Sequence, residues 1–290
     1  MKEQKALSII ILLAIVLFVT TLLVPFIPVP IPWLTFGRIL SSAWFVSLPV
    51  FLLFYTNSLR WSSQSLVIFL IFGILCVLGA SLFPFPKDTE SEQMMKFDIA
   101  MRTAFSGLGT ILWSGALGVF MAKLIKDKNL LIPVAFVLAT VDIIVTMMPF
   151  GTVQQILRTP GGRMAFEALA YKVPEFGVAT PAAFIGPADL LFLSMFFCVV
   201  HRFELNARAT LFALVPALVL YLWVVLFWGG YTLWGIRLNT LPALVPISLS
   251  ILLANIGNFK LNRNEKIMTF AVVIFCILAL SLGFWFSLKK

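Results

Sequence analysis

The chain has 290 residues, of which 61% are hydrophobic and 11% are charged, with 21 Lys and Arg against 12 Asp and Glu and a net charge of +9. A soluble globule cannot cover so much apolar surface with so few charges, which excludes soluble enzymes, secreted disulfide scaffolds and disordered proteins. The composition therefore predicts an all-α polytopic membrane protein in contact with the lipid bilayer. The basic excess is typical of helix ends beside lipid headgroups, and we expect no nucleic-acid partner.

Membrane-spanning helices need about 20 mostly apolar residues. In chain order, the apolar runs predict about nine spans: 6–26, 41–57, 64–84, 100–123, 129–150, 180–200, 208–228, 240–257 and 267–287. Prolines between residues 25 and 32 stiffen the connection before the second span. The Lys and Arg on the two sides are nearly equal in number, so the orientation stays open.

Two connections are long. Residues 85–99 are expected to form a polar turn, and residues 151–179 form the longest loop. Within that loop, the segment from Met164 to Tyr171 is expected either as a short interfacial helix or as part of a partly ordered linker.

Ten of the 12 acids lie at or beyond the edges of the predicted spans, whereas Asp142 and Asp189 are predicted well inside apolar helices. Burying an ionisable group in the hydrocarbon costs at least about 2.5–3.5 kcal/mol, so such residues indicate function. The two helices are consecutive and antiparallel, which predicts similar depths for the two carboxylates. Two carboxylates that share a site hold one proton between them, and this provides an acid and a base. The pair alone leaves a hydrolase and a proton- or cation-coupled transporter equally open.

The residues around the two acids form an ordered set of motifs. Val141-Asp142 is followed by Pro149-Phe150-Gly151, residues 186–189 read GPAD, and residues 242–244 read PAL at the start of a later helix. This set resembles the presenilin and signal peptide peptidase family of intramembrane aspartyl proteases over residues 129–257. Here Val141 stands in place of the family's aromatic residue, and Ala188 stands in place of its glycine. Prepilin peptidases fit less well, because the chain has no Cys-x-x-Cys pair and no Lys soon after Asp189.

The resemblance implies a presenilin-like bundle and an intramembrane aspartic endopeptidase that needs no metal and no cofactor. Asp142 and Asp189 would be the catalytic pair, and the substrates would be transmembrane helices of proteins or signal peptides. The residues implied to bind substrate are Gly186, Pro242, Ala243 and Leu244.

The motifs also divide the chain into three regions. Residues 1–128 form an N-terminal four-helix membrane region, residues 129–258 form the catalytic-type region, and residues 259–290 form an additional C-terminal helix. Ala188 keeps a further alternative open, namely a family member that binds membrane helices without cutting them.

The proposed chemistry makes further demands on the chain. Water has to reach the two acids, and the hydroxyls of Thr140, Thr146 and Ser194 are expected to line its path. A substrate helix has to unwind locally before cleavage, and the loop 151–179 is the candidate edge along which the extended segment would pair. Short loops and the lack of an Asn-x-Ser/Thr sequon are typical of a prokaryotic plasma membrane.

Overall fold

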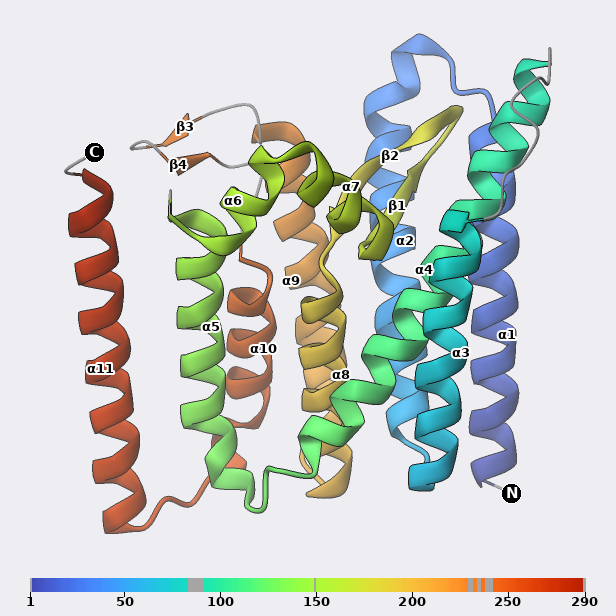
Figure 1. Cartoon of the computed structure of the whole chain (residues 1–290). Helices are drawn as coiled ribbons and strands as arrows, with labels where there is room; N and C mark the ends of the chain where they lie inside the picture. Colours follow the sequence, from blue (N-terminus) through green and yellow to red (C-terminus); the bar gives the residue numbers. More distant parts are fainter. Residues whose placement is uncertain are drawn as a thin grey trace. The chain divides into compact units, whose positions relative to one another are not determined.

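The computed structural model describes residues 2–82, 91–148, 150–228, 232–233, 236–237 and 242–288. These residues are mainly helical and include two short antiparallel hairpins (Figure 1). The helices and strands, in chain order, are α1 (Lys2–Leu23), α2 (Leu34–Asn57), α3 (Ser63–Leu82), α4 (Glu92–Ala122), α5 (Leu131–Met147), α6 (Thr152–Arg158), α7 (Pro160–Leu169), β1 (Tyr171–Glu175), β2 (Val178–Ile185), α8 (Pro187–Arg202), α9 (Ala207–Trp228), β3 (Thr232–Leu233), β4 (Ile236–Arg237), α10 (Leu244–Asn255) and α11 (Arg263–Leu288).

Seven helical segments of the described chain are long and apolar enough to cross a membrane. They are Glu3–Phe26, Leu34–Asn57, Ser63–Leu82, Glu92–Ala122, Lys128–Arg158, Ala207–Trp228 and Arg263–Phe286, and Leu244–Asn258 is a shorter apolar helix. The chain is therefore a mainly helical protein with the features of a membrane-embedded one. The count of nine spans and the presenilin-like bundle remain predictions.

Helices and strands gather into two compact units, each built from two stretches of the chain. Unit 1 comprises Met1–Ala122 and Ala165–Cys198, and unit 2 comprises Lys123–Met164 and Val199–Lys290. The three-region division, which follows motifs rather than contacts, remains a prediction.

Close helix packing defines unit 1. Helices α3 and α4 approach at Gly73 and Gly109, where a Cβ atom on either glycine would lie 2.7 Å from the other's carbonyl oxygen. Small residues allow such an approach between helices in lipid, where close packing replaces the hydrophobic effect as the driving force. Helix α1 packs on α2 and α4, and the core is filled by fully buried side chains that include Phe45, Leu53, Ile111 and Phe196.

The hairpin β1–β2 lies against α2 and α4 in unit 1 (Figure 1). Tyr171 pairs with Ile185 and Val173 with Ala183, and the register shifts before Glu175. Gly177 has a φ of +70°, a left-handed conformation that glycine adopts without a steric penalty, and so permits the tight turn. The loop predicted at 151–179 is therefore largely ordered as α6, α7 and the hairpin.

The predicted span 180–200 is wrong in its first part. Residues 178–185 form strand β2, and α8 begins only at Pro187. Pro181 lacks an N–H and would break a helix interior, whereas Pro187 suits the first helical position. The structure also moves two other boundaries, because α2 begins at Leu34 and α4 begins at Glu92, within the predicted polar turn.

Unit 2 contains α5, α9, α10 and α11, which lie side by side (Figure 1). Helix α10 packs against both α5 and α9, and α11 packs against α5. The most deeply buried side chains include Leu131, Leu214, Ile247 and Ile251. Helix α10 thus fills the space between two longer helices, and its first residue lies next to Asp142 of α5.

Candidate functional site

Asp142 of α5 is buried in unit 2, with 9% of its surface exposed. Its Oδ2 atom accepts a hydrogen bond of 2.8 Å from the backbone N–H of Leu244. Leu244 is the first residue of α10, so its N–H belongs to the four that a helix leaves without an intrahelical acceptor. A carboxylate at this position satisfies the donor and interacts favourably with the positive end of the helix dipole. A buried acid on one helix therefore caps the helix that begins with the Pro-Ala-Leu motif.

The other two residues of that motif accept backbone hydrogen bonds from the first turn of α10. The carbonyl of Pro242 accepts from the N–H of Val245, and the carbonyl of Ala243 accepts from the N–H of Ile247. Pro242 is buried and has no N–H of its own, so it leaves no further donor beside Asp142. Pro149 of the Pro-Phe-Gly motif lies outside the described residues.

Two hydroxyl groups on the packed helices α5 and α10 differ in their hydrogen bonding. Thr146 donates a bond of 2.6 Å to the backbone carbonyl of Asp142, while Gln154 of α6 donates to the carbonyl of Thr146 and so fastens α6 to the end of α5. Ser248 is 4% exposed, and its Oγ atom has no hydrogen-bond partner among the described residues. Ser248 follows Leu244 by four residues and so lies on the same face of α10. Sequence reasoning missed Ser248, although its spacing from the Pro-Ala-Leu motif is the signal that could have found it.

Asp189 lies in the first turn of α8 in unit 1, which corrects the prediction that it sits well inside a helix. Its Oδ2 atom accepts a hydrogen bond of 3.2 Å from the N–H of Gly186, and its own N–H donates to the carbonyl of Gly186 at 3.1 Å. An acid at the third helical position that binds the N–H of the residue before the helix forms half of a capping box. The helix starts late because the strand runs up to Ile185, so Asp189 takes a helix-terminal position.

Helix α8 is fixed in unit 1 by a buried polar cluster. Ser194 donates to the carbonyl of Gly115 at 2.8 Å and accepts from the side-chain amide of Asn57 at 3.0 Å. All of Ser194 is buried, so its hydroxyl joins α8 to α4 and α2 instead of lining a water path as predicted. Phe197 also packs edge to face on Phe54, with the ring centroids 5.3 Å apart.

The hairpin that leads into α8 is held at both ends. The hydroxyl of Tyr171 donates to the carbonyl of Phe45 at 3.0 Å, and Arg38 pairs with Glu175 at 2.7 Å. At the turn, the N–H of Gly177 donates to the carbonyl of Val24. The strands are therefore anchored to α2 and to the turn after α1, which makes the hairpin a fixed part of unit 1.

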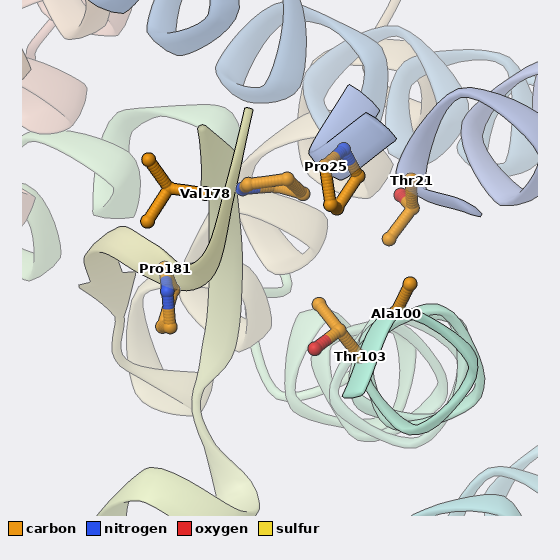
Figure 2. A pocket seen from close by; sticks show the side chains of 7 residues that line it. Thr21, Pro25, Ala100, Thr103, Val178 and Pro181 are labelled. Carbon is orange, nitrogen blue, oxygen red and sulfur yellow. The ribbon is translucent and has the colours of Figure 1, made fainter. Parts of the chain in front are cut away.

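A small pocket lies between the hairpin, the end of α1 and α4 (Figure 2). The lining side chains are uncharged and include three prolines: Thr21, Pro25, Ala100, Thr103, Pro174, Val178 and Pro181. Pro174 and Pro181 cannot donate to the strand ladder, in agreement with the shifted register there.

The predicted site residues thus form two local groups. In unit 2, Asp142 contacts Leu244 next to Pro242 and Ala243; in unit 1, Gly186 contacts Asp189. Among the described residues, no group of three or more His, Cys, Asp or Glu could hold a metal ion. Comparisons of the chain with protein-family models, curated proteins and solved structures find no match.

Proposed function

We propose that the protein is an intramembrane aspartyl protease that hydrolyses peptide bonds in transmembrane segments, with Asp142 and Asp189 as its catalytic pair. The observation that carries the proposal is the hydrogen bond from Leu244 to Asp142. It joins two of the three motifs of the presenilin and signal peptide peptidase family, which stand 102 residues apart in the chain. The third motif supplies Asp189 and Gly186, which contact each other.

The reaction would use one ionised and one protonated carboxyl group. The ionised group takes a proton from a water molecule, whose oxygen forms a bond to the scissile carbonyl carbon while the protonated group gives its proton to the carbonyl oxygen. The C–N bond of the tetrahedral intermediate then breaks as the leaving nitrogen takes a proton from the pair, and one hydroxyl group of the intermediate returns its proton to the pair as the new carbonyl forms. The products are a carboxylic acid and an amine, and the two carboxyl groups again share one proton. Because the pair titrates as a unit, we assign neither role to one residue.

Substrate binding would require an extended segment, because an intact helix keeps its carbonyls hydrogen-bonded. Strand β2 offers the more exposed surface of the hairpin, with Val178, Thr180 and Phe184 exposed, whereas β1 is mostly buried. A segment that paired with this hairpin would be led towards Gly186, which lies directly between β2 and α8. On the Asp142 side, Pro242, Ala243 and Leu244 would contact the substrate.

A reporter transmembrane peptide reconstituted with the protein in liposomes tests the proposal. Asp142→Asn and Asp189→Asn should each abolish cleavage, because neither amide can take up or share the catalytic proton. Asp98→Asn is the control, since Asp98 forms a local ion pair with Arg102 and should be dispensable for cleavage. Normal cleavage by either catalytic variant would refute the aspartyl mechanism. Solute or proton flux that is lost in the same variants, without proteolysis, would indicate a transporter.

A second candidate is a member that binds membrane helices without cutting them. The bond between Asp189 and Gly186 favours it, because a helix cap gives this acid a structural role of its own. The exposed residue Ala188 also adds a methyl group where the family has glycine. This candidate predicts that the unaltered protein does not cleave and that Ala188→Gly introduces cleavage. Full activity of the unaltered protein would exclude it.

A further inference from the structure

We propose that one end of unit 2 is a binding surface for the headgroups of anionic phospholipids. This basic end consists of residues 123–130, 202–210 and 255–266, which connect the ends of α5, α8, α9, α10 and α11 (Figure 1). It carries eight Lys and Arg residues against three acids. The cations are Lys123, Lys126, Lys128, Arg202, Arg208, Lys260, Arg263 and Lys266; Lys128 is half-buried and the other seven are exposed.

Hydrogen bonds between the three segments make them one surface. Asn129 donates to the carbonyl of Lys260 at 3.2 Å and accepts from the N–H of Lys260 at 3.3 Å. The side-chain oxygen of Asn255 accepts from the N–H of Asn206 at 2.7 Å, and the guanidinium of Arg202 donates to the carbonyl of Ile125. The loops are thus tied to one another within the unit, and their cations are presented together.

Two of the three acids at this end are engaged by neutral donors. Asp127 accepts from the N–H of Asn129 at 2.7 Å. Glu265 accepts from the N–H of Asn262 at 2.8 Å and from the side-chain amide of Asn129 at 3.1 Å. Glu265 and Asn262 form a capping box at the start of α11, because the N–H of Glu265 also donates to the side chain of Asn262. These carboxylates therefore stabilise helix starts, and the surface keeps a large positive excess.

The positions of the helix ends indicate that lipid headgroups bind at this surface. Helices α5, α9 and α11 begin at this end and belong to the candidate spans, so the cations lie at the level where a bilayer presents its headgroups. Three helix N-termini also direct their positive dipole ends towards this surface, while α8 and α10 contribute two C-termini. Anionic lipids attract juxtamembrane Lys and Arg, and the cytoplasmic leaflet carries the more negative surface. The basic end is therefore assigned to the anionic leaflet, which orients unit 2 where residue counts alone leave the choice open.

The test measures lipid binding by the purified full-length chain in neutral detergent micelles. Phosphatidylglycerol or phosphatidylcholine is added in steps, and retained lipid is counted by native mass spectrometry. Each cation near an anionic surface contributes roughly fivefold to binding, so Lys126→Gln with Arg263→Gln should weaken phosphatidylglycerol binding by roughly 10- to 30-fold at low salt. The matched control is Arg158→Gln with Arg163→Gln, which removes two exposed cations beyond the other end of α5 and should change binding by less than about threefold.

Several results would overturn the proposal: equal binding of the two lipids, an equal loss in both double variants, or full displacement of the lipid by inorganic phosphate, which would indicate a soluble anion. Because the Lys126/Arg263 variant could fail to fold, Lys126→Arg with Arg263→Lys serves as a charge-conserving variant. It should retain the wild-type preference for phosphatidylglycerol, and loss of that preference in a folded protein would also contradict the proposal. High salt should reduce the preference of the unaltered protein.

Discussion

At the scale of single residues, hydrogen bonds distinguish buried polar groups that have a structural partner from those that have none among the described residues. Sorting the acids by their position in apolar runs is enough to select Asp142 from the sequence. The motifs also predict that a later helix begins at Pro242-Ala243-Leu244, but the sequence could not show that the backbone N–H of Leu244, 102 residues away, donates to this acid. For the same reason, the sequence could not distinguish the bonded hydroxyl of Ser194 from the unbonded hydroxyl of Ser248.

Ser194 and Ser248 provide a matched pair of buried helical serines. Ser194→Ala should destabilise the protein by about 1–3 kcal/mol, because it leaves the side-chain amide of Asn57 without one of its acceptors. Ser248→Ala should leave stability unchanged or raise it, because it removes a buried hydroxyl that has no partner in the described part of the chain. Thermal unfolding of both variants in the same micelles measures the difference. Equal losses would show that Ser248 is bonded as firmly as Ser194.

At the scale of elements, hydropathy identifies most of the helices but not the hairpin. An apolar run of strand length cannot be distinguished from part of a buried helix by hydropathy, which therefore merges residues 178–185 with α8. The prolines at 181 and 187 are the available signals, since the first disfavours a helix interior and the second favours a helix start. This correction changes the setting of Asp189 from mid-helix to helix end.

The hairpin contains Lys172, and burial lowers the pKa of this lysine below its usual value of 10.5. Nearby Glu167 raises the pKa and Arg102 lowers it further, but burial is the largest effect. Below the lowered pKa, Lys172 is charged in both the folded and the unfolded chain. Burying this charge then lowers the free energy of unfolding by its full amount. As the pH rises from the lowered pKa to 10.5, Lys172 loses its proton in the folded protein before it does so in the unfolded chain. The destabilisation that comes from burying the charge therefore decreases over this range.

Lys172→Met should therefore raise the melting temperature by a few degrees at pH 7, and the gain should shrink as the pH approaches 10.5. Melting curves recorded across this range measure it. Lys5→Met is the control, because Lys5 is exposed and its removal should produce no such trend. A gain that stays constant with pH would show that better apolar packing, and not the buried charge, is the cause.

The contact between α4 and α8 depends on Gly118. A Cβ atom there would collide with the carbonyl oxygen of Leu191 and lie 2.7 Å from the Cβ of Ser194. Gly118→Ala should therefore destabilise the protein by about 1–3 kcal/mol, since backbone atoms cannot move aside as a flexible side chain can. Gly79→Ala on α3 is the matched control: no neighbouring atom of the described residues lies within 4 Å of the place its methyl group would take, and alanine improves helix propensity by about 1 kcal/mol. A loss of equal size in both variants would contradict a specific role for the α4–α8 contact.

At the scale of the whole molecule, the two predicted catalytic acids belong to different compact units. Asp142 is held in unit 2 by α10, and Asp189 is held in unit 1 by the start of α8. Local hydrogen bonds therefore fix each carboxylate separately, and the proposed chemistry additionally requires the two units to bring them within reach of one water molecule. The proposed proteolysis would thus depend on the arrangement of the units as well as on the acids themselves.

Cross-linking in the membrane tests this requirement without a substrate. Cys76, Cys198 and Cys276 are first replaced by Ala, and Asp142→Cys is then combined with Asp189→Cys. A specific protease site is inserted at the exposed residue Thr159, between the two positions. If the proposed function is correct, a short bifunctional thiol reagent should hold the two fragments together on a denaturing gel after proteolysis.

The control combines Asp142→Cys with Glu204→Cys, an exposed residue in the connection after α8 that also lies beyond the protease site, and should give little cross-linked product. Each single-cysteine variant shows how much product arises between different molecules. Efficient cross-linking of the control pair without that of Asp142 and Asp189 would contradict a shared catalytic site. The transporter could also bring the two acids together, so a positive result establishes the pair, and cleavage of the reporter peptide then decides which chemistry the pair performs.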